Sequence, residues 1–260
     1  MIPIQTILAI LSGGAVGFSL GLIGGGGSIL AVPLLLYVVG VEDPHVAIGT
    51  SALAVAANAF AGLIGHWRAG TVKWRCALVF ALGGVFGAVL GSTLGKLVDG
   101  QKLLFLFALV MIAGGVAVLR PPASGADCDV RMTLRIAVRL SILGFIAGIV
   151  SGFFGIGGGF LIVPGIMLGS GMPILNAIGS SLFSVGVFAL TTAVNYALSG
   201  LVEWRIALTF IAGGVAGGVL GIKAAVRLGS HKRTLNYVFA VVVFTVAAIM
   251  AIRTGVELFG

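Results

Sequence analysis

Two glycine clusters are the residues of this chain whose type and spacing most directly suggest binding chemistry. Their members are Gly24, Gly25, Gly26 and Gly27, followed by Ser28, and Gly155, Gly157, Gly158 and Gly159. Each cluster precedes a short apolar segment and is therefore expected to open a helix. The first N–H groups of a helix have no partner within it, and glycines let a ligand approach them. We predict that both clusters, with Ser28, bind a small anion; close helix packing is the alternative role for glycine.

Hydroxyl and amide side chains within apolar runs are the other candidate substrate contacts. They are Thr50, Ser51, Asn58, Ser180, Ser181 and Asn195. A hydroxyl at the start of a helix can donate a hydrogen bond to an anion, but it can equally cap the helix or bond to the preceding turn. Each asparagine either bridges two helices or contacts the solute. The sequence leaves these alternatives open.

Charged side chains are missing from the middle of the apolar runs, so no proton relay, sodium ligand or arginine clamp is evident. The sequence contains no recognisable Ser-His-Asp or Cys-His set and no phosphate-binding motif. The two cysteines, Cys76 and Cys128, do not have the spacing of a metal site. We therefore expect a protein that is not an enzyme, with no cofactor and no metal.

The composition requires a lipid environment around these residues. Of 260 residues, 59% are hydrophobic, 8% are charged and 43 are glycines, and the mean hydropathy is +1.23. A soluble domain carries about 25% charged residues. A water-soluble enzyme is therefore excluded, and an all-α polytopic membrane protein with closely packed helices is predicted. The net charge of +8 comes from Lys and Arg between apolar runs, which indicates membrane topology rather than nucleic-acid binding.

The apolar runs predict roughly 8–10 membrane segments, because one span needs about 20 apolar residues. The predicted segments are 3–23, 28–40, 46–65, 76–96, 103–119, 136–155, 159–170, 174–197, 206–225 and 235–252. Segments 28–40 and 159–170 are too short to span, and each contains a proline. We expect each to be a half-helix that forms a broken or re-entrant hairpin with the segment before it.

The two halves of the chain resemble each other in one register. Residues 17–33 match residues 148–164 at an offset of 131, and Gly49-Thr50-Ser51 matches Gly179-Ser180-Ser181 at an offset of 130. We infer a first repeat over residues 1–120, a polar linker over 121–135 and a second repeat over 136–260. If the repeats are inverted in the membrane, most Lys and Arg lie on the side of the linker. Because cytoplasmic loops concentrate these residues, inverted-topology repeats with a cytoplasmic linker and a periplasmic C-terminus are predicted.

The glycine motif occurs in two copies, Gly-Leu-Ile-Gly-Gly-Gly-Gly-Ser-Ile-Leu-x2-Pro and Gly-Phe-Phe-Gly-Ile-Gly-Gly-Gly-Phe-Leu-x2-Pro. Each copy is followed downstream by Gly-[Thr/Ser]-Ser. With these paired motifs, the chain resembles the TauE/SafE family of sulfite exporters. The resemblance covers nearly the whole chain. It implies a multi-pass transporter of the bacterial inner membrane for small sulfur-containing anions: sulfite, sulfoacetate or other organosulfonates. We expect export by alternating access at the interface of the two repeats.

Several alternatives remain at this point. Within transport, they are an anion channel, a carrier of other small organic anions and a thiosulfate conduit that uses Cys76 and Cys128. Outside transport, they are a membrane-embedded enzyme, an assembly subunit and a scaffold. The sequence also leaves open proton coupling and homo-oligomerisation.

Overall fold

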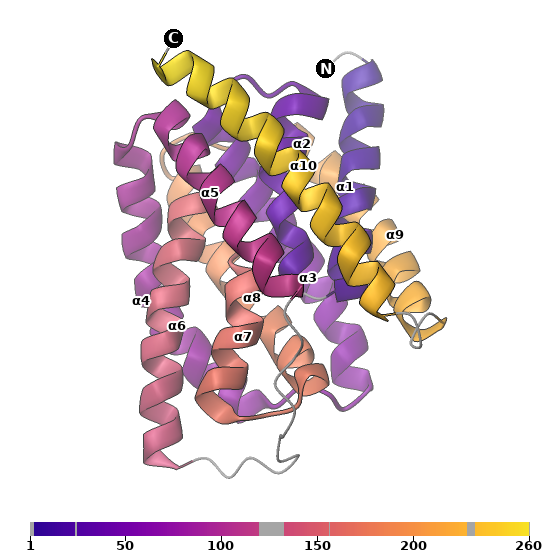
Figure 1. Ribbon diagram of the computed structural model, residues 1–260, viewed down its shortest axis with the longest axis vertical. Helices are drawn as coiled ribbons and strands as arrows, with labels where there is room; N and C mark the ends of the chain where they lie inside the picture. Colours follow the sequence, from indigo (N-terminus) through magenta and orange to yellow (C-terminus); the bar gives the residue numbers. More distant parts are fainter. Residues whose placement is uncertain (1–2, 24, 120–132, 156, 228–231, 260) are drawn as a thin grey trace.

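The computed structural model describes residues 3–23, 25–119, 133–155, 157–227 and 232–259, and every regular element in these ranges is helical (Figure 1). The predicted segments are confirmed as helical, with boundaries that differ by a few residues. The first half contains α1 (Pro3–Ile23), η1 (Gly25–Leu30), α2 (Ala31–Leu34), η2 (Leu35–Val39), α3 (Pro44–Arg68), α4 (Trp74–Leu97) and α5 (Gly100–Leu119). The second half contains α6 (Leu134–Phe154), α7 (Gly159–Ser170), α8 (Ile174–Ala197), α9 (Trp204–Arg227) and α10 (Lys232–Phe259).

Helix starts follow from local capping chemistry. Asp43 precedes Pro44, and its carboxylate accepts the backbone N–H of His45 at 2.7 Å. Asp99 likewise accepts from Gln101 at the start of α5, and Thr133 accepts from Ile136 at the start of α6. These side chains satisfy N–H groups that have no carbonyl partner in the first turn.

Within the described ranges, six helices are long and apolar enough to cross a membrane: α1, α3, α4, α6, α8 and α9. Many large apolar side chains on them face outward, such as Phe86 on α4 and Leu208 on α9. Outward apolar side chains on long helices suit a lipid surrounding. The protein is therefore a multi-pass membrane protein.

Glycines join helices of one half to helices of the other. On α1, a Cβ at Gly17 would collide with the carbonyl of Gly214 on α9, and a Cβ at Gly13 with that of Phe210. On α6, a Cβ at Gly148 would collide with the carbonyl of Gly84 on α4. The residues in contact follow the same order along the two helices of each pair, so α1 and α9 run parallel, as do α4 and α6. Small residues let the backbones approach closely, which is how helices pack in lipid.

Each half contains a helical hairpin. In the second half, Gly158 faces Ser151 and Gly169 faces Leu140, so α7 runs back along α6. In the first half, Gly27 faces Leu20 of α1, and the side-chain amide of Gln5 donates to the Val39 carbonyl at 3.3 Å. The segment from η1 to η2 therefore runs back along α1. The two hairpins that the sequence predicts are present, each with a short returning arm.

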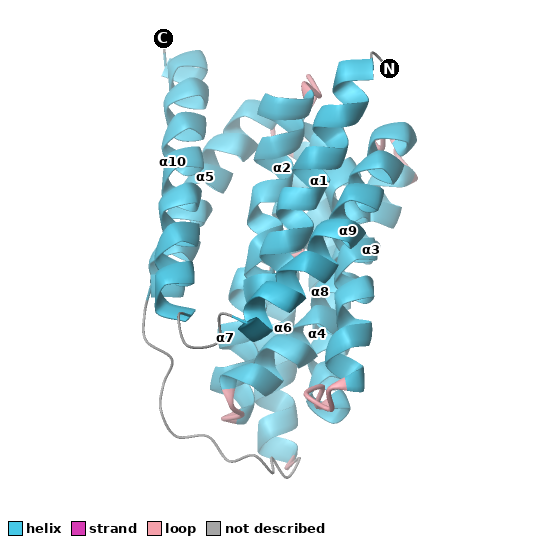
Figure 2. Ribbon diagram, turned by 90° about the vertical axis from the view of Figure 1, so that its right-hand side faces the viewer, coloured by secondary structure: helices cyan, strands magenta, loops and turns pink. Residues whose placement is uncertain are grey.

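Helices α3 and α8 cross the centre of the bundle. Gly49 faces Tyr196, Phe60 faces Gly186 and Gly62 faces Leu182, so the two helices are antiparallel. Helices α5 and α10 pack on each other and form a separate layer beside the bundle (Figure 2). The start of α1 and the end of α10 lie at one end of the molecule, and α6 begins at the opposite end (Figure 1).

The α1–α9 contact can be tested with two neighbouring glycines. A Cβ at Gly17 meets the Gly214 backbone, whereas a Cβ at Gly14 lies 3.6 Å from the nearest atom, the Gly213 carbonyl oxygen. Gly17→Ala is expected to lower the free energy of unfolding by about 1–3 kcal/mol through overpacking. Gly14→Ala is expected to be neutral or to stabilise by up to about 1 kcal/mol through helix propensity. Thermal unfolding in detergent measures both variants, and equal effects would contradict the proposed contact.

Candidate functional site

The second glycine cluster interrupts the α6–α7 hairpin with left-handed backbone. Gly155, Gly157 and Gly158 have φ of +68°, +68° and +63°, a region that glycine adopts without steric cost. Gly158 is the N-cap of α7 and has no side chain to accept the helix's first N–H groups. The Gly158 carbonyl accepts the N–H groups of Leu161 and Ile162, so the N–H groups of Gly159 and residue 160 are the ones without a carbonyl partner inside α7.

This break lies between the central helices of the two halves. A Cβ at Gly157 would be 3.0 Å from both Val55 of α3 and Val185 of α8. A Cβ at Gly155 would collide with Ile48 of α3. The backbone of the cluster thus reaches the α3–α8 interface, with apolar side chains around it and room for no side chain of its own.

The first glycine cluster has a different conformation. Gly25, Gly26, Gly27 and Ser28 belong to the 310 turn η1, and Gly24 lies outside the described residues. Ser28 is fully buried. A Cβ at Gly27 would collide with the backbone of Ser19 and Leu20 on α1, so packing alone already requires this glycine. The two clusters match in sequence but not in backbone geometry.

Thr50 and Ser180 make equivalent contacts in the two halves. Thr50 Oγ1 accepts the backbone N–H of Glu203 at 3.0 Å, and Ser180 Oγ accepts that of Lys73 at 2.9 Å. Glu203 and Lys73 immediately precede α9 and α4, so each hydroxyl holds the start of a helix in the opposite half. This contact between the halves is neither of the two structural roles considered from the sequence, which were capping of the residue's own helix and a bond to the preceding turn. A role of Thr50 and Ser180 in solute binding stays a prediction.

Ser51 and Ser181 follow these residues and donate to their own helices. Ser51 Oγ donates to the Ile48 carbonyl at 2.9 Å, and Ser181 Oγ donates to the Ile178 carbonyl at 2.8 Å. The Ser51 hydroxyl also lies 3.5 Å from the carbonyl oxygen of Gly155, the first residue of the second cluster. Ser51 thus contacts the second glycine cluster, and the role of both serines in solute binding stays a prediction.

Asn58 is buried on α3 and faces α9. A Cβ at Gly214 would collide with its amide nitrogen, so the carboxamide lies directly on the glycine backbone. Neither its nitrogen nor its oxygen has a hydrogen-bond partner among the described residues. The equivalent position in the second half is Phe188, which stacks on Phe80 with ring centroids 6.1 Å apart. Asn58 therefore places a carboxamide without a hydrogen-bond partner at a position that an apolar side chain occupies in the other half.

Asn195 belongs to a separate polar cluster between α8 and α4. Its amide nitrogen donates to Ser92 Oγ at 2.6 Å and to Thr93 Oγ1 at 3.1 Å. Its amide oxygen accepts from Lys96 Nζ at 2.8 Å, and that ammonium group also donates to Ser199 Oγ at 2.8 Å. Asn195 thus bridges two helices, and these contacts do not link it to either glycine cluster.

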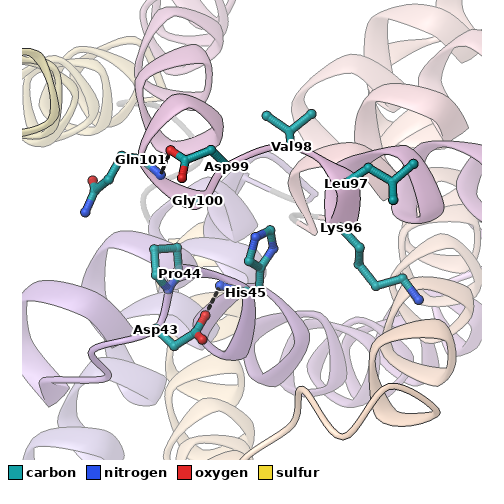
Figure 3. A pocket seen from close by; sticks show the side chains of 9 residues that line it. All are labelled: Asp43, Pro44, His45, Lys96, Leu97, Val98, Asp99, Gly100 and Gln101. Carbon is teal, nitrogen blue, oxygen red and sulfur yellow. Dashed lines mark hydrogen bonds between the residues drawn. The ribbon is translucent and has the colours of Figure 1, made fainter. Parts of the chain in front are cut away.

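An open surface pocket of about 620 Å³ lies beside this polar cluster, where α3 and α5 begin and α4 ends (Figure 3). His45 and Lys96 line it together with Asp43 and Asp99. Both carboxylates are engaged as helix caps, and the Lys96 ammonium is held by Asn195 and Ser199. Lys96 could not be singled out from the sequence, because its hydrogen-bond partners lie about 100 residues later in the chain.

Two further buried hydroxyls were not singled out from the sequence. Ser151 on α6 and Ser184 on α8 are fully buried, and neither hydroxyl has a partner within the described part of the chain. The equivalent residues in the first half are Leu20 and Ala54. Alignment of the two halves shows an apolar residue at the position equivalent to each of these serines and to Asn58. A search for polar residues with apolar equivalents would therefore have found all three.

The described residues contain no group of three or more His, Cys, Asp or Glu that could hold a metal ion. The polar groups described near the break are backbone N–H groups and the hydroxyls of Ser51 and Ser151. These are donors for an uncharged or anionic solute that carries acceptor oxygens.

Comparison with known proteins agrees with this architecture. The family model of the sulfite exporter TauE/SafE matches residues 9–250. A probable membrane transporter protein of Xylella fastidiosa strain 9a5c is 53% identical over 253 residues, which cover 97% of each chain. The probable membrane transporter protein YunE of Bacillus subtilis is 28% identical over 247 residues, covering 86% of this chain and 89% of YunE. No solved structure matches the chain. The glycine breaks, the apolar helices and these matches together establish that the chain belongs to the TauE/SafE family of membrane transporters.

Proposed function

We propose that the protein exports small sulfur-containing anions, such as sulfite, sulfoacetate or other organosulfonates, across the bacterial inner membrane. The family's description as a sulfite exporter supports this substrate class. The observation that carries the proposal is the left-handed break at Gly155, Gly157 and Gly158, which opens α7 at the α3–α8 interface.

A sulfite or sulfonate group suits this break chemically. It presents several acceptor oxygens, and the first turn of α7 presents N–H donors together with the positive end of the helix dipole. Such a site needs no charged side chain, which agrees with the uncharged middle of the apolar runs. In the proposed site, the glycines of both clusters contact the anion, with Ser28, Asn58 and the Ser51 and Ser181 hydroxyls nearby. Thr50, Ser180 and Asn195 shape the site through the protein contacts described above.

Alternating access between two inverted repeats is the proposed mechanism. Three features support it: the repeat offset, the equivalent α1–α9 and α4–α6 pairs, and the antiparallel crossing of the equivalent helices α3 and α8. In this scheme the repeats are residues 1–120 and 136–260, joined by the linker 121–135. Export of an uncompensated anion is favoured by an inside-negative potential, by about 2.3 kcal/mol per charge per 100 mV.

The substrate class can be tested by ligand-dependent thermal stability of the purified protein. The panel consists of sulfite, sulfate, sulfoacetate, taurine, isethionate, thiosulfate and acetate. A ligand at 100 times its Kd is expected to stabilise the folded state by about 2.7 kcal/mol. We expect selective stabilisation by sulfite and sulfonates, followed by flux of the same ions in liposomes. Stabilisation by acetate alone would instead assign the protein to carboxylates.

The glycine break can be tested with two substitutions that strain the backbone equally. Gly157 and Gly171 both have positive φ, but a Cβ at Gly171 meets nothing within 4 Å, whereas one at Gly157 enters the α3–α8 interface. Each alanine variant is expected to lose about 1–2 kcal/mol of stability from the left-handed backbone. Only Gly157→Ala is expected to abolish anion binding as well, measured as loss of ligand stabilisation. Normal binding by folded Gly157→Ala protein would refute this site.

The proposed topology can be tested with the chain's own thiols. Cys128 belongs to the linker sequence, and Cys76 is buried in α4. With Cys76→Ser as the background, a membrane-impermeant maleimide is expected to label Cys128 in inside-out vesicles and not in intact spheroplasts. A cysteine added after Gly260 in a Cys128→Ser background is expected to show the opposite pattern. Labelling of both sites from the same side would rule out a cytoplasmic linker with a periplasmic C-terminus.

A further inference from the structure

Ser151 on α6, like Ser184 on α8, differs from most buried helical hydroxyls of the described bundle. Most helical serines and threonines here donate to a carbonyl of the preceding turn, as Ser92 does to Val89 and Ser170 to Ile166. This bond is always within reach of a helical hydroxyl. The Ser151 hydroxyl does not make it, although the side chain is fully buried in the last turn of α6. The hydroxyl group of Ser151 is therefore left without a hydrogen-bond partner among the described residues.

The Ser151 side chain faces the N-cap of α7. An added Cβ at Gly158 would lie 2.7 Å from Ser151 Cβ and 3.1 Å from Ser151 Oγ. No residue with a side chain fits at this position, both because of the contact and because Gly158 has a φ of +63°. A buried hydroxyl without a partner thus lies beside the start of α7, where the first N–H groups of a helix have no carbonyl partner within the helix.

A buried hydroxyl without a hydrogen-bond partner destabilises a protein, and buried polar groups are nearly always paired. A helix terminus alone is a common feature of proteins. The combination of the two, at a break between the central helices, indicates a partner that occupies the site during function. That partner must accept hydrogen bonds from both the hydroxyl and the backbone N–H groups, as an anionic oxygen does.

We propose that Ser151 donates a hydrogen bond to the anionic headgroup of the transported solute at the start of α7. The proposal rests on the function proposed above and adds a binding residue to it. The equivalent residue in the first half is Leu20, so only the second half supplies this donor. The solute site is therefore asymmetric although the two halves are repeats, and the headgroup binds closer to α7 than to η1.

The test compares Ser151→Ala with Ser170→Ala in the full-length protein. Ser170 lies at the other end of α7, about 16 Å along the helix from Gly159, and its hydroxyl is already engaged with Ile166. Affinities for sulfite, sulfoacetate and isethionate are measured by titration of ligand-dependent stability. Ser151→Ala is expected to bind all three ligands on the order of 10- to 100-fold more weakly, because it loses one hydrogen bond to a charged group. Ser170→Ala is expected to keep wild-type affinity.

Stability without ligand separates a binding role from a structural one. Ser151→Ala is expected to unfold at the wild-type temperature or above, because it removes a hydroxyl without a partner. A graded loss of affinity in Ser151→Cys, whose thiol is a weaker donor, provides a second variant. Wild-type affinity in folded Ser151→Ala would overturn the assignment while leaving the transport proposal intact. A loss confined to one ligand would overturn recognition of the shared headgroup. If the wild-type protein binds none of the three, the proposed substrate class fails, and the Ser151 assignment fails with it.

Discussion

Close backbone contact between helices of opposite halves is the constraint on which this structure depends. Lipid tails are as apolar as leucine side chains, so burial of apolar surface does little to hold membrane helices together. Contact between glycine backbones provides packing in its place, along α1 and α9 and along α4 and α6. Since each pair takes one helix from each half, neither half buries its glycine face by itself. The Thr50 and Ser180 hydrogen bonds also join the two halves, at the starts of α9 and α4.

The pairing of helices between the two halves determines where the breaks in the helical hairpins can lie. The hairpin arms fold back along α1 and α6, whose other faces are occupied by α9 and α4. The second break therefore faces the remaining neighbours, α3 and α8, and Gly157 reaches their side chains at Val55 and Val185. A rigid frame of paired helices around a broken hairpin is an arrangement in which a solute can meet backbone donors within a lipid-embedded protein.

Much of this architecture could be predicted from the sequence, because apolar run lengths and glycine clusters report segment number and breaks directly. Residues 28–40 and 159–170 were expected to be short arms of hairpins, and the structure has them. Partner choice was harder to predict, since the helices are apolar on all sides and periodicity does not identify the face that packs. For the same reason the sequence could not show that Thr50 and Ser180, which are predicted solute contacts, accept the N–H groups of Glu203 and Lys73 from the other half. Ser151 stood out only once its hydroxyl was seen to lack a partner.

The pairing of α1 with α9 also affects how the protein is made. The first helix ends at Ile23 and its main partner begins at Trp204. At a synthesis rate of about 5–20 residues per second, the interval between them is roughly 10 to 35 seconds. During this time the main neighbours available to α1 are its own hairpin arm and α3. The glycine face of α1 therefore lacks its partner α9 until the chain is nearly complete, and it must not aggregate in the meantime. The α1–α9 pair thus assembles late, rather than as each helix is inserted.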